Sequence, residues 1–332
     1  MKSLIQKLVE TNSPSGYEAN IRVVIRGEIE AYADEIRTDP MGSLIARKGE
    51  QSPEGRKIML AAHMDEIGVM ATHIDENGFV RFTTIGGVRP HTCLGGRVRF
   101  QNGATGVIGS ERLDELSKVP TFEQLFIDLG FSNRQDCTIR IGDVATFDRP
   151  FIDLGQRMVS KAMDDRIGAA VLIETLRQIK STPHELYFVF SVQEEVGVRG
   201  ATAAAYGVDP ELGVAVDVTG TGDTPKTRKM EVGLGKGPAI KVRDGGMLAD
   251  PRVVNWMVES AEKQQLPYQL EILEGGTTDA RAIQLTRAGV PTGCLSIPCR
   301  YVHSPSEMVD TSDVKNAVRL LVELLSNPVN LA

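Results

Sequence analysis

Very little in this sequence ties the chain to an oxidising compartment or to a membrane. It has four cysteines at irregular spacings and no C-x-x-C pair: Cys93, Cys137, Cys294 and Cys299. Such usage predicts neither a disulfide framework nor a cysteine-based zinc knuckle. No apolar run approaches the length that spans a bilayer, and the first residues lack the apolar segment and cleavage site of a signal peptide. We therefore expect a reduced, cytoplasmic protein with no membrane partner.

Positive charge and aromatic side chains are also scarce. Lysine and arginine number 37 against 44 acidic residues, a net charge of −7, and no basic run stands out. Such a chain does not attract nucleic acid, so we expect no nucleic-acid partner. Aromatic residues make up 5% of the chain, with one tryptophan, which disfavours a hydrolase that stacks sugars on exposed rings. The 332 residues, 41% of them hydrophobic, suffice for a large core and two domains.

Strands and helices alternate in two stretches of the chain, residues 1–66 and 155–332. Ser15 and Glu18 have the spacing of a capping box at the start of "GYEANIRVVIRGEIEAYA", and "KIMLAAH" is typical of a buried strand that ends at His63. Later, Asp250-Pro251 predicts the start of a helix. Strands separated by helices predict an α/β fold, with a mostly parallel sheet covered by helices on both faces.

Residues 67–154 differ from the rest of the chain in their residue pattern, which predicts a small inserted β-rich domain. The segments "ATHIDENGFVRFTTI" and "GRVRFQNGATGVIGS" each place an Asn-Gly turn between β-prone flanks, a strong hairpin signal. One helix is expected near "TFEQLFIDLG". The predicted organisation is therefore an α/β domain of residues 1–66 and 155–332, interrupted by a β domain of residues 67–154.

Acids and histidines gather at predicted strand ends or in the loops beside them. In an open parallel sheet, ligands bind at the carboxyl ends of the strands. The residues concerned are His63, Asp65, Asp164, Asp165, Glu194, Glu195, Asp217 and His303. Each alone has a structural explanation: Asp164 and Asp165 as helix caps, the others as turn or solvated strand-end residues. Five such clusters at one edge favour a functional site.

Carboxylates crowded in this way repel one another unless a cation lies among them. Histidine with carboxylate, and no suitably spaced cysteine, suits a catalytic zinc or similar divalent ion. The candidates are about twice the three ligands that one such ion needs, so two ions sharing a bridging carboxylate is the economical interpretation. Of the adjacent Glu194 and Glu195, one can bind an ion while the other acts as general base.

A glycine-rich segment, "EGGTTDA" at residues 274–280, leaves two interpretations open. Its backbone N–H groups could stabilise a developing oxyanion, or the segment is a plain turn with a helix N-cap.

Seven motifs together resemble the di-metal aminopeptidases of metallopeptidase family forty-two, which include glutamyl, deblocking and tetrahedral-shell aminopeptidases. In chain order they are "PSGYE", "AAHMDEIG", "KAMDDRIGAA", "QEEVGVRGA", "AVDVT", "EGGTTDA" and "HSPSEMV". The resemblance spans nearly the whole chain. It implies a zinc-exopeptidase-like α/β domain split by an inserted β-barrel that serves as a lid and dimerisation domain.

The resemblance also implies roles for individual residues. His63 and Asp217 correspond to the ligands of one metal, Glu195 and His303 to those of the other, and Asp164 to the bridging carboxylate, joined to Asp165 by a cis peptide bond. Glu194 corresponds to the general base that activates the metal-bound water, and Asp65 orients His63. Thr277, Thr278 and Asp279 are expected to bind substrate. His91 stands where the family usually has glutamine, and we include it among the substrate-binding candidates.

The expected function is a metal-dependent aminopeptidase that removes N-terminal residues from peptides. Two divalent ions per subunit are expected, zinc first, with cobalt or manganese as alternatives. Three other functions stay open: an amidohydrolase acting on N-acyl amino acids, a non-catalytic peptide-binding protein on a peptidase fold, and a glycanase. The resemblance further implies peptide substrates and a homo-oligomer built from dimers, with a tetrahedral dodecamer as its largest expected form.

Overall fold

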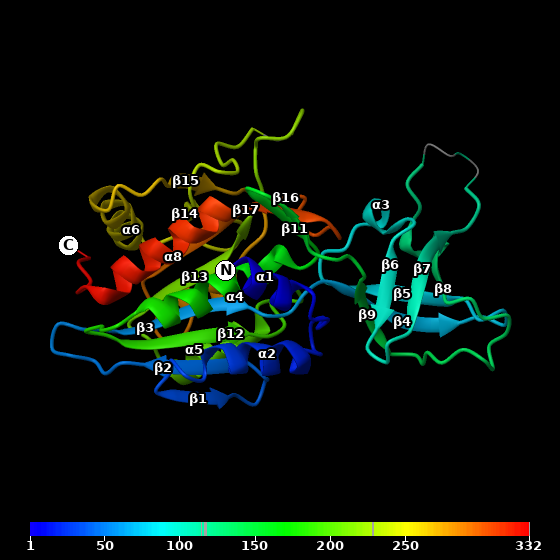
Figure 1. Ribbon diagram of the computed structural model, residues 1–332, viewed down its shortest axis with the longest axis horizontal. Helices are drawn as coiled ribbons and strands as arrows, with labels where there is room; N and C mark the ends of the chain where they lie inside the picture. The colour runs from blue at the N-terminus through cyan, green and yellow to red at the C-terminus, as the bar shows by residue number, and fades with distance from the viewer. Residues whose placement is uncertain (114, 116–117, 228, 332) are drawn as a thin grey trace.

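The computed structural model describes residues 1–113, 115, 118–227 and 229–331, and it has two parts (Figure 1). The larger part is built on an eleven-stranded sheet. Nine strands follow one another across it: β1 (Glu35–Thr38), β2 (Leu44–Lys48), β12 (Glu185–Ser191), β3 (Lys57–His63), β13 (Leu212–Thr219), β16 (Thr292–Arg300), β17 (Glu307–Asp310), β11 (Arg157–Ser160) and β10 (Ile152–Leu154). The remaining two, β14 (Ala239–Arg243) and β15 (Gln269–Ile272), branch from β16.

Parallel pairing is concentrated at the centre of this sheet. Strands β12, β3, β13 and β16 run parallel, and the outer strands pair antiparallel apart from β14 with β15. All eight residues of β13 are buried, as expected for a central strand covered on both faces. Because the four central strands share a direction, their carboxyl ends meet at one edge of the sheet, where Ser191 of β12 pairs with His63 of β3.

Within the described residues, seven helices cover the two faces of this sheet. On β3, Ile58 and Leu60 pack in the largest apolar core, whereas Met59 and Ala61 belong to a second one, because successive side chains point to opposite faces. The helices of the larger core are α1 (Lys2–Val9), α2 (Ala19–Ile29), α4 (Met163–Gln178), α6 (Pro251–Lys263) and α8 (Thr311–Ser326). The second core contains residues of α5 (Arg199–Val208) and α7 (Asp279–Gln284). The predicted α/β fold is therefore confirmed.

The smaller part is a closed six-stranded barrel that projects to one side of the sheet (Figure 1). Its strands, in order around the barrel, are β4 (Gly68–Ile74), β5 (Val80–Ile85), β8 (Leu125–Asp128), β7 (Thr105–Ser110), β6 (Arg97–Phe100) and β9 (Val144–Phe147). The two Asn-Gly turns join β4 to β5 and β6 to β7 as predicted. Gly78 and Gly103 there have φ of +89° and +90°, a backbone conformation that favours glycine.

The prediction of a helix near "TFEQLFIDLG" is wrong. That segment forms a single 3-10 turn, η1 (Phe122–Gln124), and then strand β8. Leu125 and Ile127 are buried while Asp128 is exposed, so the segment follows the two-residue period of a barrel strand. The short helix α3 (Pro90–Cys93) lies between β5 and β6 instead.

The barrel strands lie between Gly68 and Phe147, whereas β10 already pairs with β11 in the large sheet. The predicted boundaries at residues 67 and 154, and the role of the barrel as a lid and dimerisation domain, stay predictions. Within the described residues, no helix combines the length and the hydrophobicity needed to cross a bilayer.

Candidate metal centre and active site

Three elements of the large sheet deliver polar side chains to its carboxyl edge. His63 is the last residue of β3, Asp217 lies near the end of β13, and Glu194 and Glu195 follow β12 after a short turn. The side chains of His63, Asp217 and Glu195 are almost entirely buried. The strand-end residues singled out in the sequence therefore come together in space.

Asp164 and Asp165 enter this edge from the first turn of α4, and they face different ways. Both have non-helical backbone angles, with ψ of 109° and 39°, and the peptide bond between them is cis, as the resemblance implied. Asp165 Oδ1 accepts the Gly168 backbone N–H at 3.0 Å, so it caps the helical part of α4. Asp164 instead directs its carboxylate to His63. Of the two neighbours, only Asp164 faces the other candidate ligands.

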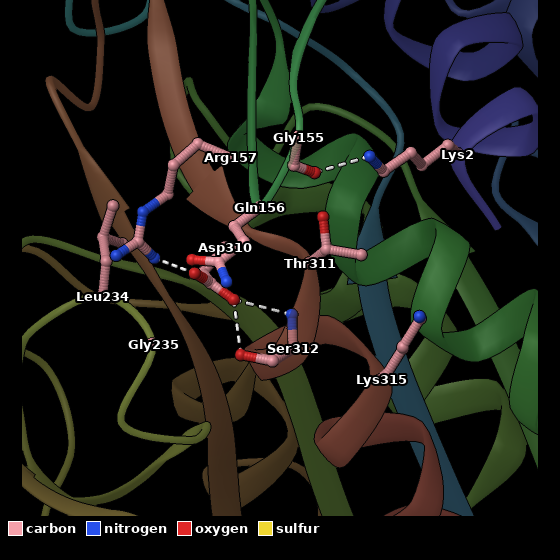
Figure 2. A pocket seen from close by; sticks show the side chains of 10 residues that line it. All are labelled: Lys2, Gly155, Gln156, Arg157, Leu234, Gly235, Asp310, Thr311, Ser312 and Lys315. Carbon is pink, nitrogen blue, oxygen red and sulfur yellow. Dashed lines mark hydrogen bonds and ion pairs between the residues drawn. The ribbon is translucent and has the colours of Figure 1, made fainter.

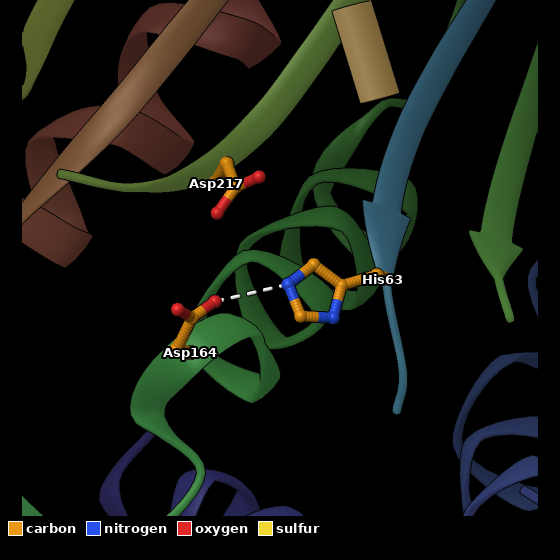
Figure 3. A group of neighbouring side chains, drawn as sticks. All are labelled: His63, Asp164 and Asp217. Carbon is orange, nitrogen blue, oxygen red and sulfur yellow. Dashed lines mark hydrogen bonds and ion pairs between the residues drawn. The ribbon is translucent and has the colours of Figure 1, made fainter. Parts of the chain in front are cut away.

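The first group of candidate ligands consists of His63, Asp164 and Asp217 (Figure 3). Each residue offers one ligand atom, and these atoms lie within 4.8 Å of one another. His63 Nε2 is 2.9 Å from Asp164 Oδ1. In Figure 3 the Asp217 carboxylate lies across from both side chains, on its own strand. Two carboxylates and one imidazole from three separate elements thus surround one position.

The second group shares Asp164 with the first and adds Glu195 and His303. His303 Nε2 lies 3.3 Å from Asp164 Oδ2 and 3.2 Å from Glu195 Oε2. The two oxygens of Asp164 therefore face different groups, Oδ1 toward His63 and Oδ2 toward His303. This is the arrangement that a bridging carboxylate requires.

Burial and mutual repulsion raise the pKa of several carboxyl groups here. Burial, followed by the charge of Asp164, raises the pKa of both Asp217 and Glu195. The pKa of Glu194 is raised well above its ordinary value, chiefly by burial and further by neighbouring acids including Asp217. For Asp164, hydrogen bonds from the two histidines outweigh burial and lower the pKa. So many buried acids together are stable in the ionised form only beside a cation.

The residues present fit a divalent metal ion. Glu195 Oε1 is buried and has no hydrogen-bond partner, although buried polar atoms are normally paired. Imidazole nitrogens and carboxylate oxygens are ligands that zinc and related ions accept, and three protein ligands leave a position free for water or substrate. Both groups meet these requirements, with Asp164 counted in each.

Asp65 links the end of β3 to the loop that carries the two glutamates. Asp65 Oδ1 accepts the Glu194 N–H at 3.1 Å and Oδ2 accepts the Glu195 N–H at 3.3 Å. Its Oδ1 also lies 3.6 Å from His63 Nδ1. Ser15 donates its hydroxyl to Asp65 Oδ2 at 2.6 Å. The predicted capping box is therefore wrong: α2 begins at Ala19 without a side-chain cap, because Asp65 recruits the serine hydroxyl.

The predicted substrate-binding residues differ in how deeply they are buried and in their hydrogen-bond partners. Thr278 is the N-cap of α7 and accepts the Ala280 N–H, as one of the two interpretations of this segment expected. Asp279 is buried and accepts a hydrogen bond from Ser191. Thr277 Oγ1 is buried without a partner. His91 is exposed on α3 and belongs to neither ligand group. Their role in substrate binding stays a prediction.

Several residues that shape this edge were not predicted from the sequence. Glu307 is buried and accepts the N–H groups of both Asp164 and His303. It lies in the motif "HSPSEMV", but four residues from His303, and nothing in the sequence indicates that its carboxylate turns back. Gly86 and Gly87 also lie here, since a Cβ on Gly87 would come within 2.3 Å of His303 Nδ1.

A separate cavity of about 510 Å³ lies at the start of α8 (Figure 2). Arg157 pairs with Asp310 there, and Asp310 caps α8 by accepting the Ser312 N–H at 2.7 Å. Its lining residues include none of the candidate ligands, so this cavity is not the candidate centre.

A model of the M42 glutamyl aminopeptidase family matches residues 42–320, most of the chain. The chain belongs to the M42 glutamyl aminopeptidase family. The match covers both groups of candidate ligands and the whole barrel. This M42 protein is a metal-dependent aminopeptidase, a hydrolase that acts on peptide bonds, and the predicted family and enzyme class are confirmed.

Individual relatives match this M42 chain over nearly its whole length. A lysyl aminopeptidase of Pyrococcus furiosus is 37% identical over 338 residues, 97% of this chain and 96% of the relative. An aminopeptidase structure from Desulfurococcus kamchatkensis has a TM-score of 0.94 and 41% identity, covering 98% of this chain and 94% of the other. The TET1 peptidase of Pyrococcus horikoshii, described as assembling into a tetrahedron or a large octahedral shell, has a TM-score of 0.88 and 31% identity, covering 98% of each chain.

Proposed function

We propose that this M42 chain removes N-terminal residues from peptides at a centre of two divalent ions. His63 and Asp217 would hold one ion, Glu195 and His303 the other, and Asp164 both. The observation that carries this assignment is the position of the Asp164 carboxylate, with Oδ1 2.9 Å from His63 and Oδ2 3.3 Å from His303. A carboxylate that capped a helix or faced solvent would not divide its oxygens between two histidines.

When bound, the two ions supply a water of lowered pKa and polarise the scissile carbonyl. Glu194 is the proposed general base. It accepts the proton of the attacking water on its carboxylate and returns the proton to the nitrogen of the leaving peptide. Its side chain is nearly buried, 11% exposed, and burial is the main cause of its raised pKa.

Asp65 and the α7 segment complete the proposed machinery. Asp65 orients the ring of His63 and, through the two backbone N–H groups it accepts, sets the place of Glu194. Thr277, Thr278 and Asp279 precede or begin α7 beside the centre, where we place the substrate's first residue. His91 is exposed on the barrel segment and is proposed to contact bound peptide.

Three finer properties belong to the same proposal. Zinc is the proposed metal, with cobalt and manganese as the alternatives that the ligand set also accepts. We expect the protein in the cytoplasm and as a homo-oligomer built from dimers, with a tetrahedral dodecamer as its full assembly, in line with the shells described for the relative from Pyrococcus horikoshii.

The test is hydrolysis of a panel of aminoacyl-nitroanilides by purified protein, after chelation and after return of zinc, cobalt or manganese. We expect metal-dependent release of nitroaniline, selective for one class of residue. A panel of N-acetyl amino acids runs in parallel. Turnover of the acetylated compounds alone, with the free-amino substrates untouched, would replace this proposal by a deacylase.

A further inference from the structure

Glu307, the first residue of β17, connects two segments of the candidate centre. It is 1% exposed. Its Oε2 accepts the backbone N–H of Asp164 at 3.0 Å, and its Oε1 accepts the backbone N–H of His303 at 2.8 Å. The two oxygens of one carboxylate therefore hold two backbone positions that are far apart in the sequence.

Both of these backbone positions lie outside regular hydrogen-bonding patterns. Asp164 has φ of −76° and ψ of 109°, which breaks the helical pattern at the start of α4. His303 has φ of +61° in the loop after β16, a conformation that non-glycine residues adopt only when the surroundings impose it. Neither N–H is thus held by a helix or strand, and the Glu307 carboxylate takes that place.

The side chains beyond these two N–H groups meet each other. His303 Nε2 lies 3.3 Å from Asp164 Oδ2, and both belong to the second ligand group with Glu195. A shift of either backbone segment would move one of these atoms relative to the other. Both Glu307 oxygens accept a backbone N–H and the residue belongs to neither ligand group, so the structure assigns its carboxylate to anchoring the backbone.

We propose that Glu307 is a positioning residue, which sets the separation of Asp164 and His303 by holding their backbone N–H groups. This inference rests on the proposed two-ion centre, because its effect is expressed through metal binding. Loss of one acceptor would loosen the second ligand group most, because Glu307 holds two of its three members, Asp164 and His303, but only Asp164 of the first group.

The experiment uses Glu307→Gln, which keeps the size of the side chain but replaces one acceptor oxygen by an NH2 donor. The matched control is Asp313→Asn. Asp313 is equally buried and accepts two backbone N–H groups, those of Gly235 and Gly237, each at 2.7 Å, outside both ligand groups. Both variants lose one acceptor of the same kind, so a general loss of stability affects both.

We measure metal content and chelator-competition affinity, kcat and KM, and the thermal midpoint of each full-length variant. For Glu307→Gln we expect one of the two ions to bind about 10–100-fold more weakly, as when groups that orient metal ligands are removed, with kcat lowered more than KM is raised. Asp313→Asn should keep wild-type metal affinity and kcat. If Glu307→Gln keeps both ions at wild-type affinity, the positioning role is overturned.

Two further measurements keep the outcomes distinct. If Glu307→Gln does not fold, we measure Glu307→Asp instead, which keeps both oxygens but withdraws them by one methylene. We expect this variant to bind one ion more weakly. Wild-type affinity for both ions would overturn the positioning role. Wild-type protein is titrated alongside. Failure of wild type to bind two ions or to cleave aminoacyl substrates would contradict the proposed function, whereas a normal wild type with an unaffected variant contradicts only the role of Glu307.

Discussion

Glu194 Oε2 lies 3.9 Å from Nε2 of His63, the nitrogen that also faces Asp164. The glutamate thus borders the first ligand group without belonging to it. Its backbone N–H is held by Asp65 Oδ1 at 3.1 Å. A carboxylate fixed beside a ligand group, but outside it, is placed as a general base has to be.

Glu194→Gln should therefore retain both ions and lose about 10²–10⁴-fold in kcat, the usual contribution of a general base. The amide fills the same space but cannot take a proton from water. Metal content and steady-state kinetics are measured on the same preparation. Glu185→Gln, at the opposite end of β12, is the control and should behave as wild type. Near-normal turnover by Glu194→Gln would rule out the proposed base.

Gly87→Ala should disturb the second ligand group by steric contact alone. Gly87 has no positive φ, so alanine is allowed by the backbone, but its Cβ would lie 2.3 Å from His303 Nδ1 and 2.6 Å from Cε1. We expect a lower affinity for one ion and a loss of kcat/KM of about 10-fold or more, because the ligand ring has to move.

The control for this variant is Gly27→Ala, on the exposed side of α2, where an added Cβ meets nothing within 4 Å. It should keep wild-type metal affinity and activity. Equal metal affinity for Gly87→Ala and Gly27→Ala would show that the ring of His303 is not packed against the backbone at Gly87.

Removal of metal should destabilise the protein. Without a cation, Asp164, Glu195 and Asp217 are left together in a buried space, and the last two have raised pKa values for that reason. An ion that binds only the folded state contributes about 2.7 kcal/mol at 100 times its dissociation constant. We expect the thermal midpoint to fall on chelation and to rise with added zinc. A sodium salt at equal ionic strength is the control. A thermal midpoint that does not change on chelation would contradict a metal centre.

Glu28 provides a test of stability against pH that is independent of the metal centre. A hydrogen bond from Lys7 Nζ at 2.6 Å and another from Arg177 lower its pKa, against the opposing effect of burial. Because the folded-state pKa lies below the unfolded value of about 4.3, the stabilisation is fully present above about pH 5 and is lost as the pH falls through the folded-state pKa.

Glu28→Gln should thus lower the free energy of unfolding by about 1 kcal/mol or less at pH 7, the range of a partly exposed ion pair. The difference from wild type should shrink toward zero in strong acid. Urea unfolding at pH 7 and at low pH measures it. Glu30→Gln, at an exposed position near the end of α2, is the matched control. A difference for Glu28→Gln that grows in acid would contradict the assigned sign.

Much of the fold could be predicted because it follows from local patterns. The apolar run before His63 and the Asn-Gly turns each depend on neighbouring residues only, and all of them formed as expected. Two predictions failed where a distant partner decided the outcome. Ser15 has the spacing of a capping box, but its hydroxyl bonds to Asp65. The segment before Asp128 is a strand because the neighbouring barrel strands pair with it.

The sequence by itself determined most of the elements that form and which residue types reach the carboxyl edge of the sheet, since both depend on periodicity and on strand direction. Only the tertiary structure decided how neighbouring acids divide their tasks. Asp164 faces two histidines while Asp165 caps α4. Glu307 turns back to hold segments that lie 143 and 4 residues away. Such contacts depend on packing between remote segments, which no local pattern records.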